Sequence, residues 1–141
     1  MSILIIDNEN RPQLAQILAD DGWVVACLCA AWCGSCREYQ ANFTALAQRH
    51  PDIRFVWIDI EDQADLMDDL DVENFPTLLI QRGKIVTFLG PVELDLHLAE
   101  RILLAQHKKS PTELAAEANS SAERREWQSN GNLLLRLQKS A

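Results

Sequence analysis

The sequence predicts an α/β fold in which a central mixed sheet is flanked by helices, with a helical extension at the C-terminal end. An apolar run at 23–30 lacks alternation, as in a strand buried on both faces, and is followed by a segment with helical spacing. A second run at 53–60 is rich in β-branched and aromatic residues. Two further runs flank Arg82-Gly83, a connection typical of an antiparallel hairpin.

The first half of the chain is expected to alternate strands and helices. A short strand at 3–6 precedes a helix that Asn10 caps, that carries Pro12 in its first turn and that ends at Gly22. The strand at 23–30 leads into a helix at 33–49, which Pro51 closes. The strand at 53–60 then completes two parallel crossovers.

The second half of the domain is expected to begin with a short acidic helix containing Leu66, Met67 and Leu70. Phe75-Pro76 interrupts the chain before the hairpin strands at 77–81 and 84–89. An amphipathic helix at 92–106 is the last core element. Residues 1–108 are therefore predicted to form one domain.

Residues 109–141 have a different composition, rich in Ala, Glu, Ser, Asn and Arg, and are predicted to be a partly helical extension. Pro111 could open a helix, and a weak apolar stripe at helical spacing consists of Leu114, Ala118, Ala122 and Trp127. The sequence leaves three roles open: packing on the domain, self-association with a second copy, or binding of a partner.

The charge of the chain argues against nucleic acid and membrane surfaces as partners. The formal net charge is −8, and the residues before Ser110 hold 9 basic and 17 acidic side chains against 4 and 4 afterwards. Phosphate binding needs clustered Lys and Arg, which such a surface lacks. The opening residues have no basic region and an apolar run of only four residues, Ile3 to Ile6, so a cytoplasmic location is expected.

All four cysteines, Cys27, Cys29, Cys33 and Cys36, fall within ten residues. In a reducing compartment a Cys-x-x-Cys pair is typical of redox or metal sites. Cys33 is placed where a strand feeds a helix, so free backbone N–H groups and the helix dipole favour its thiolate. Cys36, one helical turn later and more shielded, is the candidate resolving thiol. Exchange between two thiols and a disulfide needs no metal and no organic cofactor.

Cys27 and Cys29 share one face of the predicted buried strand. Small buried apolar side chains account for them without any chemistry. The alternative is a zinc site made by the four cysteines, which requires closed tetrahedral geometry. A straight apolar strand does not bend its residues around an ion, so the first interpretation is favoured.

Ala31-Trp32-Cys33-Gly34-Ser35-Cys36-Arg37, the downstream Phe75-Pro76-Thr77-Leu78, and Gly83 and Gly90 of the hairpin resemble the thioredoxin family over roughly residues 1–108. The resemblance implies a thioredoxin fold and exchange with protein disulfides through the Cys33/Cys36 couple, with a thiol or a reductase as electron donor. It implies that Pro76 follows a cis bond beside the cysteines and that Phe75 offers backbone groups to an extended substrate segment. Trp32, Gly34 and Ser35 would complete the substrate-binding rim.

Three positions depart from the family pattern. Ser35 replaces the usual proline, which predicts a looser turn and a somewhat more oxidising couple. Cys27 stands at the position of the family's buried acid and Trp57 at that of its lysine, so the usual proton acceptor for the resolving thiol is missing. Slow release of the mixed disulfide and a narrow range of partners are expected. The alternative function is an interaction or chaperone module whose cysteines sense redox state.

Overall fold

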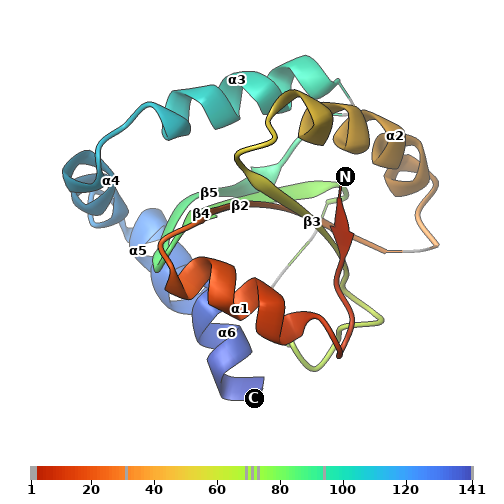
Figure 1. The fold of residues 1–141 in the computed structure, drawn as a ribbon, viewed down its shortest axis with the longest axis horizontal. Coiled ribbons are helices and arrows are strands. Elements are labelled where there is room, and N and C mark those ends of the chain that lie inside the picture. The colour runs from red at the N-terminus through yellow and green to blue at the C-terminus, as the bar shows by residue number, and fades with distance from the viewer. Residues whose placement is uncertain are drawn as a thin grey trace.

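The computed structural model describes residues 3–30, 32–68, 70, 72, 74–93 and 95–140. Helices cover both faces of a five-stranded sheet, with α2 and α3 on one face and α1 and α6 on the other (Figure 1). The elements are β1 (Leu4–Ile5), α1 (Arg11–Ala19), β2 (Trp23–Cys29), α2 (Gly34–Arg49), β3 (Arg54–Asp59), β4 (Thr77–Arg82), β5 (Ile85–Pro91), α3 (Leu96–His107), α4 (Pro111–Ala118), α5 (Ala122–Asn130) and α6 (Leu133–Ser140).

The sheet is mixed, with strand order β1-β3-β2-β4-β5. Strand β3 runs parallel to both β1 and β2, whereas β4 is antiparallel to β2 and β5. The fold class predicted from the sequence is therefore confirmed. At the carboxyl end of β2, Cys29 lies opposite Asp59 of β3, and Leu28 lies opposite Thr77 of β4.

The core forms one apolar layer on each face of the sheet. The layer under α2 and α3 holds Val25, Cys27, Cys29, Cys36, Tyr39, Phe43, Leu46, Ala47, Ile53, Phe55, Trp57, Leu78, Ile80, Val92, Ala99 and Leu103. The layer under α1 and α6 holds Ile6, Leu14, Leu18, Val24, Ala26, Leu28, Val56, Ile58, Leu66, Met67, Leu79, Val86, Leu133 and Leu137. Since side chains alternate along β2, its cysteines all face α2.

Among the described residues after β3 the predicted acidic helix is not seen, and residues 60–67 make a series of turns instead. One carboxylate oxygen of Asp59 accepts the backbone N–H groups of Glu61 and Asp62, at 2.9 and 3.1 Å. Such local bonds offer the backbone an alternative to helix, which explains the wrong prediction. Leu66 and Met67 are nevertheless buried, so their spacing reflected contact with the core rather than helical periodicity.

Most boundaries differ from those predicted by one or two residues, and the start of α3 differs most. Helix α3 begins at Leu96 rather than at 92, because the Asp95 carboxylate accepts the N–H of His97 at 2.9 Å and caps the helix there. The first strand is only two residues long.

In the predicted hairpin, Gly83 has φ +54°, and a Cβ added there would lie 2.6 Å from Asp21 Oδ1. A glycine is therefore required at this turn.

The extension forms three helices that pack on the domain, near β5 and α1 (Figure 1). The Gln128 side chain accepts the N–H of Val86 and donates to its carbonyl, each at 2.8 Å. The amide thereby occupies part of the edge of β5 as a neighbouring strand would. Trp127 packs edge-on against Phe88, with ring centroids 6.1 Å apart. Of the three roles left open by the sequence, packing on the domain is observed.

A buried polar network fixes the start of α6 to β4. Gln81 Nε2 donates to Asn132 Oδ1 at 2.7 Å and to the Gly83 carbonyl at 2.9 Å. The N–H of Leu133 donates to Gln81 Oε1 at 2.9 Å, and Asn132 Nδ2 donates to the Lys84 carbonyl at 2.8 Å. Each of these groups would lose a hydrogen bond in a buried site without its partner, so the network ties residues far apart in sequence. The division of the chain at residue 108 itself stays a prediction.

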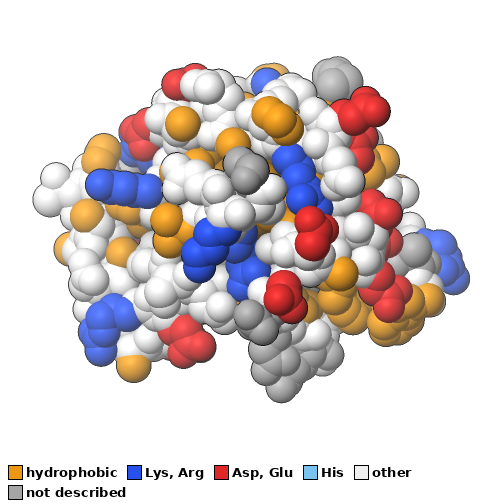
Figure 2. All heavy atoms as spheres, turned by 90° about the horizontal axis from the view of Figure 1, so that it is seen from below, with side chains coloured by type: hydrophobic (Ala, Val, Ile, Leu, Met, Phe, Trp, Pro, Cys, Tyr) orange, Lys and Arg blue, Asp and Glu red, His pale blue; other side chains and the backbone are white. Residues whose placement is uncertain are grey.

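Charges of both signs share the face seen from below the sheet. Figure 2 shows Lys and Arg side chains interspersed with Asp and Glu on this face. Arg11 of α1 pairs with Asp65 at 2.8 Å, which lowers the pKa of that carboxyl through a hydrogen bond from the guanidinium. Among the described residues, no helix is both long and apolar enough to span a membrane.

Candidate active site

Strand β2 delivers the cysteine segment to one end of the sheet. Cys33 is the N-cap residue of α2, with extended backbone angles of φ −85° and ψ 118°. Its N–H donates to the Ala30 carbonyl at 3.0 Å, and its carbonyl accepts from the N–H of Arg37 at 3.3 Å. The residue is therefore held at the start of α2, at the positive end of the helix dipole.

Cys33 is the accessible member of the four cysteines, and the other three are buried. The Cys33 side chain is partly exposed, whereas Cys36 and Cys29 are each 1% exposed and Cys27 is fully buried. The contrast between an accessible Cys33 and a shielded Cys36 is the one predicted from the helix position. Since attack on a bulky partner requires access, Cys33 is the candidate for the first step.

Cys36 is disulfide-bonded to Cys29, and their Cα atoms lie 5.7 Å apart. The sulfur of Cys27 lies 3.5 Å from that of Cys29, and Cys33 and Cys27 are free thiols. The interpretation of Cys29 as an inert apolar side chain is therefore wrong. Cys36 can bond to only one partner at a time, so a Cys33–Cys36 disulfide stays a prediction for another state of the chain.

The zinc alternative lacks its donors in this arrangement. Two of the four sulfurs that it needs as thiolates are bonded to each other. Within the described ranges, no group of three or more His, Cys, Asp or Glu side chains is placed to hold a metal ion.

The two core departures from the family pattern lie side by side. Cys27 and Trp57 are paired across β2 and β3. Burial raises the pKa of the Cys27 thiol, so this position holds a neutral group where the family has an acid. Asp59 lies opposite Cys29, but its carboxylate is bound to the backbone of the following turn.

Tyr39 of α2 is fully buried, and no partner for its hydroxyl is found among the described residues. Burial raises the pKa of this phenol. An unpaired buried hydroxyl costs about 1–3 kcal/mol. Tyr39→Phe should therefore increase the free energy of unfolding by about 1 kcal/mol, measured by urea denaturation. A less stable Phe variant would mean that the hydroxyl has a partner.

The predicted substrate rim is assembled at the same end of the sheet. Trp32 is 63% exposed and contacts Phe75 edge-on, with ring centroids 5.7 Å apart. The Phe75–Pro76 peptide bond is cis, as the resemblance implied. Gly34 and Ser35 are exposed in the first turn of α2, and a Cβ added at Gly34 would lie 3.8 Å from the Arg37 guanidinium, an ordinary van der Waals contact. The roles of these residues in binding stay predictions.

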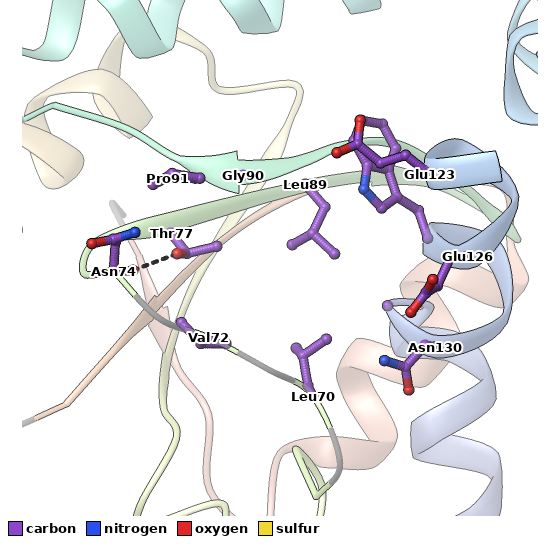
Figure 3. A pocket seen from close by; sticks show the side chains of 12 residues that line it. Leu70, Val72, Asn74, Thr77, Leu89, Gly90, Pro91, Glu123, Glu126 and Asn130 are labelled. Carbon is purple, nitrogen blue, oxygen red and sulfur yellow. Dashed lines mark hydrogen bonds between the residues drawn. The ribbon is translucent and has the colours of Figure 1, made fainter. Parts of the chain in front are cut away.

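A pocket of about 430 Å³ lies on the far side of the cis-proline segment. Figure 3 shows its walls: Leu70, Val72 and Asn74 of the segment before Pro76, the end of β5, and helix α5 of the extension. None of its lining residues is a cysteine, so this pocket is separate from the redox site.

Comparison with known proteins agrees with this geometry. The family model described as Thioredoxin matches residues 5–100. The chain belongs to the thioredoxin family. It is 30% identical over 110 residues to an H-type thioredoxin of Picea mariana, covering 77% of this chain and 88% of the relative. It is 29% identical over 83 residues to mitochondrial thioredoxin-3 of Saccharomyces cerevisiae, covering 59% of this chain and 64% of the relative, so it spans less than two thirds of that protein.

Among solved structures, thioredoxin f2 in its complex with ferredoxin:thioredoxin reductase superposes with a TM-score of 0.65 at 18% identity, covering 76% of this chain and 96% of the other. This likeness confirms the thioredoxin fold. Family membership together with a disulfide-forming pair of cysteines supports thiol–disulfide exchange as the chemistry of this chain. Sequence reasoning did not predict that Cys29 forms a disulfide with Cys36. The signal that the sequence offered was the position of Cys29 on the strand face that meets α2.

Proposed function

We propose that this member of the thioredoxin family is an oxidoreductase for protein disulfides, in which Cys33 attacks and Cys36 resolves. The observation that carries the proposal is the position of Cys33: it heads α2 and is partly exposed, with Cys36 buried one turn behind it. The helix start favours the thiolate of Cys33, and its access admits a partner.

The reaction is two successive thiol–disulfide exchanges. The Cys33 thiolate attacks one sulfur of the partner's disulfide, forms a mixed disulfide and releases the partner's other sulfur as a thiolate. The Cys36 thiol, after losing its proton, attacks Cys33, and the second partner sulfur leaves as a thiolate that takes up a proton. The partner gains two electrons and two protons in all. A thiol held one helical turn away acts at high effective concentration.

Substrate recognition is proposed at the rim around Cys33. The exposed ring of Trp32 packs against Phe75, which precedes the cis-proline. Backbone groups of Phe75 would pair with an extended segment of the partner, as in β-augmentation. Gly34 is exposed and has no side chain, which lets that segment approach the sulfur.

The electron donor is proposed to be a thiol or a reductase. One protein of the same fold forms a complex with ferredoxin:thioredoxin reductase, which supports a protein donor as one option.

A cytoplasmic location is also proposed, although the relatives include a mitochondrial protein. Immunodetection in fractionated cells would test it.

The direct test is trapping with Cys36→Ser. Without the resolving thiol, partner proteins should accumulate as mixed disulfides on Cys33 and be released by a reductant. The variant that also carries Cys33→Ser is the control and should trap nothing. An empty trap in the single variant would contradict the proposed function.

A second candidate is a redox-sensing interaction module. The observation that favours it is the buried Cys29–Cys36 bond, together with Cys27 in place of the family's acid. Turnover separates the two functions, because an enzyme reduces many disulfides per molecule when electrons are supplied. A sensor reduces one disulfide per molecule and stops.

A further inference from the structure

We propose that the disulfide of the oxidised protein moves inwards, from Cys33–Cys36 to Cys29–Cys36, and that Cys29 is a third redox-active residue. This inference rests on the proposed function, which forms the first of the two disulfides. It assigns chemistry to a strand residue outside the Cys-x-x-Cys pair.

The geometry brings Cys36 within reach of both partners. Cys33 lies one helical turn before Cys36 on α2, and Cys29 faces it from the end of β2 with a Cα separation of 5.7 Å. Cα separations of 4.4–6.8 Å are usual for disulfides. Cys29 and Cys36 belong to the same buried apolar layer, so they meet without unfolding of either element.

The transfer is an internal exchange that needs no external oxidant or reductant. Cys29 loses its proton and its thiolate attacks the Cys36 sulfur of the Cys33–Cys36 disulfide. The Cys29–Cys36 bond forms, the Cys33–Cys36 bond breaks, and Cys33 leaves as a thiolate that takes up the proton equivalent given up by Cys29. One disulfide and one thiol are present before and after, so no electrons are gained or lost.

The transfer buries the disulfide and leaves the accessible cysteine, Cys33, as a free thiol. Both sulfurs of the inner disulfide belong to residues that are 1% exposed, so external thiols cannot attack it directly. Cys33 is again a free and partly exposed thiol. Reduction of the chain would then run backwards through Cys33, which attacks Cys36 and returns the disulfide to the outer position.

Cys27 provides a matched control. It lies on the same strand face, and its sulfur is 3.5 Å from that of Cys29, yet it is a free thiol. Cys27→Ser changes a buried cysteine of β2 as Cys29→Ser does, without removing either partner of the inner disulfide.

The experiment maps the disulfide of the oxidised protein. The protein is oxidised with oxidised glutathione, its free thiols are blocked with a maleimide, and it is digested with chymotrypsin. Cleavage after Trp32 and Tyr39 separates residues 33–39 from the β2 cysteines, and cleavage after Leu28 separates Cys27 from Cys29. A Cys29–Cys36 disulfide joins two peptides, whereas Cys33–Cys36 closes a loop within 33–39.

The proposal expects the two-peptide species from the wild type and from Cys27→Ser, with maleimide on Cys33. In Cys29→Ser the joined species should be lost and replaced by the looped peptide, with no maleimide on Cys33. Only the looped peptide from the wild type would overturn the proposal, and this reading does not depend on the folding of any variant.

Failure of the proposed function would look different. If wild-type protein gave the joined peptides but showed no turnover of protein disulfides, the oxidoreductase proposal would fail and the inner disulfide would stand. If turnover were normal and the looped peptide alone were found, the function would stand and the inward transfer would be overturned.

Discussion

Cys33→Ser is expected to reduce the rate of protein-disulfide reduction by at least about a thousandfold, because the thiolate is the nucleophile and serine cannot form a disulfide. The other three cysteines cannot substitute for it, since all are buried. The measurement is the reduction of insulin disulfides with a chemical or enzymatic electron source in excess.

Cys27→Ser serves as the matched control for this prediction. It removes a cysteine of the same buried cluster that has no part in the proposed exchange, and its rate should stay near that of the wild type. If Cys33→Ser kept more than about a tenth of wild-type turnover, another thiol would have to be the nucleophile and the proposed roles would be wrong.

Gln81→Ala is expected to cost about 3 kcal/mol of unfolding free energy, the largest stability effect that the structure suggests. The substitution leaves the Leu133 N–H without its acceptor and Asn132 Oδ1 without one of its donors, all in a buried site. It also leaves a cavity between β4 and α6. Urea denaturation monitored by circular dichroism gives the difference.

The control is the same substitution on the surface. Gln16 of α1 is exposed, and its side chain donates to Asp20 Oδ1 at 3.0 Å. Gln16→Ala should change stability by no more than about 0.5 kcal/mol. Equal losses for the two variants would mean that the network between β4 and the extension does not stabilise the fold.

The elements that sequence patterns predicted well are those whose apolar residues are buried by regular structure. Strand β2 follows from its continuous apolar run, helix α2 from its helical spacing, and the hairpin from Gly83. The helix predicted for the acidic segment was wrong. Leu66 and Met67 have helical spacing, but the side chain of Asp59 accepts hydrogen bonds from the backbone that follows it and favours turns. Local hydrogen bonds of this kind are not visible in a hydrophobic pattern.

Contacts between distant residues account for what the sequence left open. Gln81 and Asn132 are 51 positions apart, so nothing local shows that they meet or that the extension packs on the sheet. Cys29 was placed correctly on a buried strand face, but its bond to Cys36 depends on how α2 lies across β2. The Cys-x-x-Cys pair, by contrast, is a local feature that sequence reasoning could identify.

The central claim is that the start of α2 makes Cys33 the reactive thiol of the reduced protein. Its most direct measurement is the rate of alkylation of each cysteine by iodoacetamide at neutral pH, resolved by mass spectrometry of peptides. The account predicts that Cys33 reacts faster than free cysteine, while Cys27, Cys29 and Cys36 react much more slowly. A rate for Cys33 no higher than that of free cysteine would contradict it.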